Sequence, residues 1–330
     1  MNKICIIIPY FGKFPNYFDF WLKSAEFNSH IDFLIFTDNV SYQSEKNIKF
    51  IYMSFQDFKD LLQKEIEFPI CLDEPYKICD YRPVFGSALR SYISEYTFWG
   101  FGDVDLILGD LSQFLTSDIL RKYDKIYNLG HLTLLRNNSF CNNLWKTIHH
   151  IKKAYRYDEA FKTPYPCHFD ETDGLTPIAK IKGVKTYTNP DFADIDRRNF
   201  NFLMLGKEDT MHPGVFEWKK GKLNYLYKQN DEVISQEVAY AHFQKRKLTI
   251  QNKSSIASIE KFVIEPNTIL TNYQLDKILN NQKIVDEYDY YKTSRRNEII
   301  GNIKKHAIQQ RLYRLFLMKI NRKRLDRTTK

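Results

Sequence analysis

Asp103 and Asp105 are the residues whose types and spacing most directly suggest chemistry. They follow an aromatic stretch at residues 96–102, rich in Phe, Tyr, Trp and Gly. In extended backbone, residues i and i+2 point to the same side, so this spacing predicts that both carboxylates aim at one point. Two hard anionic ligands suit Mg²⁺ or Mn²⁺ that holds a phosphate. The alternative is an ordinary strand end with a turn-forming Asp, because the D-x-D pattern is short and common.

A second segment with chemical potential is residues 237–246, in which an apolar run leads to His242 and then to Lys245 and Arg246. A neutral imidazole is a good third ligand for a carboxylate-bound Mn²⁺, and the basic pair can neutralise phosphate oxygens. We therefore expect His242 to complete a metal site with Asp103 and Asp105. The alternative is a histidine whose hydrogen bonds are satisfied inside the core.

Residues 168–174 place three carboxylates and a histidine within seven positions. Such a set can supply a general base and acceptors for hydroxyl groups, and Asp170 is the first candidate base, with Glu171 the second. The alternative is a polar loop that caps the helix expected after it. A further acidic cluster, which we interpret as turn and capping chemistry rather than catalysis, consists of Asp191, Asp194 and Asp196.

The elements that must position these residues begin with three dense apolar runs at residues 3–10, 31–38 and 48–53. Runs of this kind predict strands buried on both faces, as in a parallel sheet, and the segments between them predict helices. Ligands of such sheets bind outside the carboxyl ends of the strands. The residues expected there are Tyr10, Phe11, Gly12, Thr37 and Asp38. Neither a G-x-G-x-x-G nor a G-x-x-x-x-G-K-[ST] motif is present, so dinucleotide and P-loop signatures are absent.

Asp80 and Arg82 precede Pro83, which is expected to open a helix running to about Glu95. Lys77 belongs to the same cluster, and backbone N–H groups at a helix N-terminus favour anions, so these residues are candidates for binding an anion. The alternative is a solvated helix cap.

The net charge of +9 belongs to one end of the chain. Residues 301–330 carry ten Lys or Arg and one acid, so the first 300 residues are formally neutral. A neutral body argues against nucleic-acid binding. The apolar spacing within residues 302–324 predicts a basic amphipathic helix, which suggests either an anionic membrane surface or docking on the body or a partner.

The five Cys residues form no zinc-type spacing, which favours reduced thiols and a cytoplasmic location. The N-terminus shows no cleavable signal, and no apolar run reaches the roughly 18 to 20 residues of a spanning helix. The predicted location is therefore the cytoplasm, free or peripheral on the inner face of the cytoplasmic membrane.

Six segments in order resemble small bacterial GT-A-fold glycosyltransferases of capsule and lipopolysaccharide (O-antigen) loci. The segments are I-I-I-P-Y-F-G, F-T-D, K-I-C-D-Y-R-P-V-F-G, F-W-G-F-G-D-V-D-L-I-L-G, H-F-D-E-T-D-G and Y-A-H-F-Q-K-R. The resemblance covers about residues 1–265. It implies an α/β fold with a mixed, mostly parallel sheet flanked by helices. Residues 1–265 would be the catalytic domain, divided into a nucleotide-binding half (1–110) and an acceptor-binding half (111–265). Residues 266–330 would be a helical extension that ends in the basic helix.

The same resemblance implies roles for individual residues. Asp103 would lie near ribose and metal, Asp105 and His242 would ligate Mn²⁺ or Mg²⁺, and Lys245 or Arg246 would meet phosphate. The nucleoside would lie against Tyr10, Phe11, Gly12 and Asp38, and the donor sugar or diphosphate against Asp80 and Arg82. Asp170 and Glu171 would be the acceptor-side carboxylates.

The resemblance therefore implies a glycosyltransferase of the hexosyltransferase class. It would move a sugar from a nucleoside diphosphate sugar, with UDP expected, to a hydroxyl of a glycan or lipid-linked glycan acceptor. Two other functions stay open: a metal-dependent nucleotidyltransferase, and a non-catalytic protein that binds a membrane or a partner.

Overall fold

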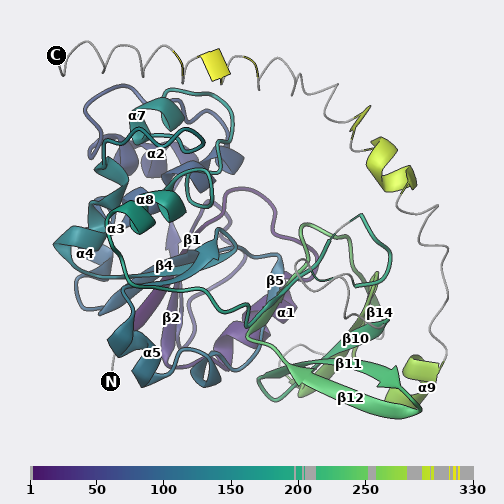
Figure 1. The fold of residues 1–330 in the computed structure, drawn as a ribbon. Helices are drawn as coiled ribbons and strands as arrows, with labels where there is room; N and C mark the ends of the chain where they lie inside the picture. Colours follow the sequence, from purple (N-terminus) through teal and green to yellow (C-terminus); the bar gives the residue numbers. More distant parts are fainter. Residues whose placement is uncertain are drawn as a thin grey trace.

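The fold is seen in a computed structural model, which describes residues 3–196, 198–202, 204, 213–251, 258–280, 292–297, 299–300, 312, 315, 316 and 319. Most of the chain expected to form the basic helix at 302–324 lies outside these residues. The described part contains three β-sheets, and most of its labelled helices lie around the sheet that contains β1, β2 and β4 (Figure 1).

The largest sheet is mixed and mostly parallel, which confirms the predicted fold class. Its order is β3-β2-β1-β4-β7-β6-β8, and within it β3, β2, β1 and β4 run parallel while β7 is antiparallel to both neighbours. The three apolar runs of the sequence supply its first strands. The strands are β1 (Ile4–Pro9), β2 (Ile31–Thr37), β3 (Ile48–Tyr52), β4 (Phe98–Gly102), β6 (Lys125–Leu129), β7 (Leu132–Arg136) and β8 (Thr186–Tyr187).

Both faces of this sheet are covered, because β1 alternates its side chains between two separate cores. Cys5 and Ile7 enter one core, and Ile4, Ile6 and Ile8 enter the other. The first core is closed by α2 (Phe55–Gln63), α3 (Phe85–Ala88), α4 (Arg90–Ile93) and α8 (Leu175–Ile181). The second is closed by α1 (Phe18–Glu26) and α5 (Ser117–Lys122).

The helix expected from Pro83 to about Glu95 is broken into short pieces. A 3₁₀ segment, η1 (Pro75–Val84), contains Pro83 near its end, and α3 and α4 follow it. Proline has no backbone N–H to donate, so Pro83 does not favour a continuous α-helix through this segment. The consequence for the site is that Asp80 and Arg82 lie within a buried 3₁₀ segment rather than at an exposed helix start. Further short helical segments are η2 (Leu111–Gln113), α6 (Ser139–Asn142), η3 (Leu144–Lys146) and α7 (Tyr157–Ala160).

The second sheet is built by the later part of the chain, in the order β12-β11-β10-β15-β16-β14. A β-hairpin turns at Lys220-Gly221, where β10 pairs with β11. β15 and β16 pair across residue 265, the expected boundary between the catalytic domain and the extension. The strands are β10 (Gly214–Lys219), β11 (Lys222–Gln229), β12 (Glu232–Glu237), β14 (Thr249–Gln251), β15 (Lys261–Glu265) and β16 (Thr268–Leu270), and α9 (Leu275–Asn280) follows.

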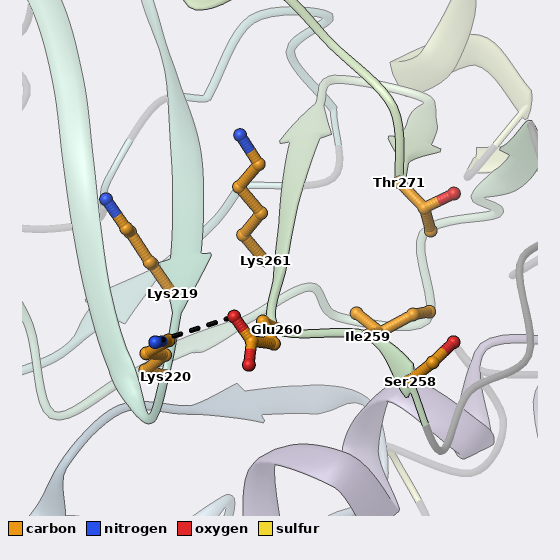
Figure 2. A pocket seen from close by; sticks show the side chains of 7 residues that line it. All are labelled: Lys219, Lys220, Ser258, Ile259, Glu260, Lys261 and Thr271. Atoms are coloured by element: carbon orange, nitrogen blue, oxygen red, sulfur yellow. Dashed lines mark ion pairs between the residues drawn. The ribbon is translucent and has the colours of Figure 1, made fainter.

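A cavity of about 350 Å³ lies on this second sheet (Figure 2). Lys219 and Lys261 face it from opposite positions on β10 and β15, and Lys220 pairs with Glu260 at 3.5 Å. Neither Asp103, Asp105 nor His242 lines this cavity, so it is separate from the predicted metal site.

The third sheet is small and joins the two larger ones. It consists of β5 (Leu106–Leu108), β13 (Tyr240–His242) and β9 (Ala193–Asp194), with β13 in the middle. Among the helices of the described residues, none is long and apolar enough to cross a membrane.

Trp218 fastens the second sheet to β5. Its indole N–H donates to the carbonyl of Leu108 at 3.0 Å, and its ring stacks on Phe262 with centroids 5.1 Å apart. The side chain is fully buried in the core that also contains Ile107. This one residue therefore supplies both packing and a hydrogen bond at the joint.

Replacing Trp218 with Ala is expected to lower the free energy of unfolding by about 3–5 kcal/mol, because it leaves a cavity at the joint and an unpaired carbonyl. Urea unfolding followed by circular dichroism measures the loss. Val40→Ala is the control, because Val40 is 75% exposed and its truncation is expected to cost well under 1 kcal/mol. Equal midpoints for the two variants would contradict the role given to Trp218.

Candidate functional site

Asp103, Val104 and Asp105 form the bend between β4 and β5. The expectation of extended backbone is wrong here, because strand pairing stops at Gly102 and resumes at Leu106. Val104 is buried and Asp103 donates its backbone N–H to the carbonyl of His131 at 3.1 Å, which anchors the bend. The two carboxylates nevertheless converge: each has an oxygen in a cluster whose atoms lie within 4.8 Å of one another.

His242 belongs to that cluster, although it is far from the D-x-D in sequence. It lies on β13, which pairs antiparallel with β5 so that His242 is opposite Leu106. Its Nε2 lies 3.5 Å from Oδ1 of Asp105. The turn after β13 closes the arrangement, because the backbone N–H of Lys245 donates to Oδ2 of Asp105 at 2.8 Å. The proximity expected between Asp105 and His242 is therefore observed.

The electrostatics of the pair follow from burial and mutual contact. Burial alone would raise the pKa of Asp105, but the hydrogen bond and charge of His242 hold it below its ordinary value. Burial alone would lower the pKa of His242, but hydrogen bonds to Asp105 and Asp194 raise it to about 10. The imidazole therefore carries a proton that a cation would have to displace.

Asp194 is a functional candidate that the sequence reasoning assigned to turn and capping chemistry. It lies on β9, beside β13, and its Oδ1 is 2.8 Å from Nδ1 of His242. The side-chain amide of Gln244 donates to the same oxygen at 2.9 Å. Burial acts to raise the pKa of Asp194, but these contacts lower it, so the group is held as a carboxylate. This contact depends on the pairing of β9 with β13, which no local sequence pattern predicts.

His131 is a second residue that the sequence reasoning did not select. Its ring lies against His242, with centroids 4.5 Å apart and planes at 32°. Its Nδ1 lies 2.9 Å from the Tyr240 hydroxyl, and its Nε2 has no hydrogen-bond partner among the described residues. Burial and the neighbouring His242 lower the pKa of His131 to about 3, so it stays neutral.

Arg82 connects the D-x-D to the expected acceptor-side carboxylates. Its guanidinium binds a carboxylate oxygen of Asp103 on one side and Oδ2 of Asp170 at 2.9 Å on the other. It also donates to the carbonyl of Gly130 at 2.8 Å, and the Gly130 N–H donates to Glu171 at 2.8 Å. The two carboxylates raise the pKa of Arg82, although its burial alone would lower it.

Gly130 lets these charged side chains approach the backbone closely. A Cβ at this position would lie 2.5 Å from Oδ2 of Asp170, 2.7 Å from Oε1 of Glu171 and 2.8 Å from Arg82. No larger residue fits without displacing the groups around it.

Asp170 and Glu171 differ in their access to solvent. Asp170 is only 1% exposed, and burial raises its pKa well above the ordinary value despite the opposing charge of Arg82. Glu171 is half-buried and keeps some exposed surface. The candidate order expected from the sequence, Asp170 before Glu171, does not match this difference in access.

Asp80 is fully buried and its carboxylate is occupied by the protein. It pairs with Lys77, which is 2% exposed, and accepts the backbone N–H groups of Cys167 and Phe169 at 2.8 Å and 2.9 Å. These bonds hold the loop that precedes Asp170. The expected contact of Asp80 with a donor sugar or diphosphate is not supported by this burial.

The basic pair after His242 divides into one buried and one exposed side chain. Arg246 is 7% exposed and donates to the backbone carbonyls of Asp196, Asn199, Phe200 and Pro266. Lys245 is exposed, and its Nζ lies 3.8 Å from the centroid of the Tyr76 ring. Tyr76 is itself 56% exposed, so this contact lies at the surface.

The residues expected to hold a nucleoside lie at the carboxyl ends of β1 and β2. The N–H of Gly12, whose φ is +98°, donates to Oδ1 of Asp38 at 2.7 Å, so the two loops are joined. Tyr10 and Phe11 are half-buried beside them. Burial raises the pKa of Tyr10 and the charge of Asp105 adds to the effect, which places Tyr10 within electrostatic range of the cluster. Asp103 lies at the same edge, after the parallel strand β4.

The donor set fits a hard divalent cation. Two carboxylates and one imidazole nitrogen converge within 4.8 Å, and ligands of this kind suit Mn²⁺ or Mg²⁺. Without a cation, the negative charges of Asp103 and Asp105 are balanced by Arg82 and by protonated His242. A second group of possible ligands shares His242 and contains His131 and Asp194.

The fold and the site together define a mixed α/β protein with a candidate metal centre at the carboxyl edge of its main sheet. Residues 6–273 match the sequence profile of a family described as a family of unknown function, DUF6625. The match spans most of the chain, so the chain belongs to this family. None of the curated proteins compared with the chain matches it.

Solved glycosyltransferases share a distant likeness with the chain. An active-site mutant of LgtC is 13% identical with a TM-score of 0.40, covering 74% of this chain and 88% of LgtC. The galactosyltransferase LgtC in complex with donor and acceptor sugar analogs is 12% identical with a TM-score of 0.37, covering 73% and 87%. The glycosyltransferase GlyE of Streptococcus pneumoniae TIGR4 is 13% identical with a TM-score of 0.34, covering 61% of this chain and 47% of GlyE. Likenesses at this level do not identify an activity.

Replacing Asp80 with Ala is expected to lower the free energy of unfolding by about 3–5 kcal/mol, because Lys77 would keep a buried charge without its partner. Chemical unfolding measures the change. Asp73→Ala is the matched control: Asp73 pairs with Lys59 at 3.3 Å but is 74% exposed, so its loss is expected to cost about 0–1 kcal/mol. A small effect at both positions would contradict the structural role of Asp80.

Proposed function

We propose that this chain is a metal-dependent glycosyltransferase that uses a nucleoside diphosphate sugar as donor and a hydroxyl as acceptor. The observation that carries the proposal is the convergence of Asp103, Asp105 and His242 at the edge where β1, β2 and β4 end. Hexosyl transfer from a UDP-sugar to a glycan or lipid-linked glycan of a bacterial surface polysaccharide is the finer form of this proposal. It rests on the resemblance of the six sequence segments.

The residues present fit the needs of a departing diphosphate. When bound, a divalent cation at Asp103, Asp105 and His242 would neutralise charge that develops on the diphosphate. Lys245, exposed on the turn after β13, is positioned to add a positive charge at the same edge. Such charges help most when they are stronger in the transition state than in the ground state. Arg246 takes no part in this proposal, because its guanidinium is committed to backbone carbonyls.

Tyr10, Phe11, Gly12 and Asp38 form the proposed nucleoside side of the site. Their loops follow β1 and β2 and are already joined by the bond between Gly12 and Asp38. A loop held in this way loses less conformational freedom on binding than a free loop. Arg82 is the proposed link from the cation to the sugar, because it contacts Asp103 and the Asp170 side of the site at once.

Glu171 is the proposed carboxylate for the acceptor hydroxyl if the reaction inverts. A general base must come within hydrogen-bond reach of the proton that it accepts. Glu171 retains exposed surface, whereas Asp170 is buried and bonded to Arg82. We assign Asp170 instead to holding Arg82 in place.

The double substitution of Asp103→Ala and Asp105→Ala is expected to abolish metal-dependent turnover, because two of the three proposed ligands are lost. The assay screens nucleotide sugars with Mn²⁺ and Mg²⁺ and identifies the product by mass spectrometry. Release of a nucleoside diphosphate supports glycosyl transfer, whereas release of pyrophosphate identifies a nucleotidyltransferase. Full activity of the double variant, or of the wild type in excess EDTA, would refute the metal-dependent proposal.

Glu171→Gln is expected to lower kcat by about 10²–10⁴-fold, because the amide cannot accept the hydroxyl proton. Its effect on Mn²⁺ affinity is expected to be small, since Glu171 does not belong to the ligand cluster. Steady-state kinetics and calorimetry measure the two quantities. Unchanged kcat would remove Glu171 as a base and would favour a mechanism that retains the configuration of the donor sugar.

A further inference from the structure

Asp194 contacts the side of His242 that faces away from the D-x-D. We propose that Asp194 is a positioning residue that fixes the tautomer and the ring orientation of His242, so that Nε2 faces the point shared by Asp103 and Asp105. This inference rests on the proposed metal centre and deepens it. It assigns to Asp194 a function in cation binding without direct contact with the cation.

The two ring nitrogens of His242 have different partners. Nδ1 lies 2.8 Å from Asp194, a hydrogen-bond distance, whereas Nε2 lies 3.5 Å from Asp105. A carboxylate at Nδ1 favours the tautomer with its hydrogen on that nitrogen, which leaves the lone pair of Nε2 directed toward Asp105 and a bound cation. Loss of Asp194 would remove this preference and allow the opposite tautomer.

The main chain holds Asp194 and His242 in this relation. They are register partners on the parallel strands β9 and β13, and the N–H of Ile195 donates to the carbonyl of His242 at 2.9 Å. Gln244 also holds Oδ1 of Asp194 at 2.9 Å. Because the strand pairing uses backbone groups alone, a change of the Asp194 side chain can leave the two strands joined.

His131 restricts the imidazole from its face. The two rings lie 4.5 Å apart, and His131 is itself held by Tyr240 at 2.9 Å. His242 is thus held at its edge by Asp194 and at its face by His131. Rotation of the ring away from Asp105 would break the contact with Asp194.

Calorimetric titration of the full chain with Mn²⁺, in the absence of any nucleotide sugar, tests the inference. Asp194→Ala is expected to weaken Mn²⁺ binding by about 10–100-fold, the usual effect of removing the partner of a ligating histidine. Asp194→Asn keeps an acceptor oxygen without the charge, so a smaller loss is expected. Thermal denaturation of the metal-free variants shows whether they fold.

Asp196→Ala is the matched control. Asp196 is a buried carboxylate two residues further along, but its side chain pairs with Arg198 rather than with His242. Its removal is expected to change the Mn²⁺ dissociation constant by less than about 2-fold, within the scatter for a group outside the site. Equal losses for Asp194→Ala and Asp196→Ala would show a general structural effect and overturn the inference.

Asp105→Asn separates the inference from the proposal beneath it. If Asp105→Asn abolishes Mn²⁺ binding while folded Asp194→Ala and Asp194→Asn bind as the wild type does, the metal centre stands and the positioning role of Asp194 is refuted. If Asp105→Asn leaves binding unchanged, the metal centre itself is wrong. Loss in both Asp105→Asn and Asp194→Ala, with normal binding by Asp196→Ala, supports the positioning role.

Discussion

The pairing of β5 with β13 is the interaction on which the rest of the site depends. It places His242 opposite Leu106, one residue after Asp105, and the following turn returns the Lys245 N–H to the same carboxylate across 140 positions of sequence. Without this pairing the D-x-D would present two carboxylates and no nitrogen ligand. β9 then adds Asp194 on the other side of β13. Three strands of two or three residues each therefore assemble the polar cluster.

Buried charge around this cluster is organised as alternating signs. Arg82 lies between Asp103 and Asp170, and His242 lies between Asp105 and Asp194. Removing a charged group from water is costly unless an opposite charge or hydrogen bonds replace its hydration. Each cation here has an acid on two sides, which allows a polar site to persist beside a core of aromatic side chains. Asp80 and Lys77 form another buried pair of opposite charges, and Asp80 also holds the loop that precedes Asp170.

The sequence predicted the main sheet well, because dense apolar runs such as residues 3–10 reflect a strand buried on both faces. It also predicted that Asp105 and His242 would lie close together, since carboxylate and imidazole groups can both be ligands of one Mn²⁺ ion. It did not distinguish Asp80, which is buried against the loop at Cys167–Phe169, from Arg82, which reaches the cluster. Nor did it find Asp194 or His131, because their contacts arise from strand pairing and ring packing that leave no local pattern. The bend at Asp103-Val104-Asp105 was also not predicted, because the sequence does not show that strand pairing stops at Gly102 and resumes at Leu106.

The small sheet lies between two larger ones, and this position links ligand binding to the cohesion of the whole molecule. β5 continues from the main sheet through the bend at Asp103–Asp105, while Trp218 fastens it to the second sheet. A cation held by residues of β13 and of that bend would act as a crosslink closing a long chain segment, whose closure has an entropic cost that grows slowly with length. Binding to the folded state alone adds about 2.7 kcal/mol of stability at a ligand concentration 100 times the dissociation constant. An occupied centre would then resist separation of β13 from the bend that leads out of the main sheet.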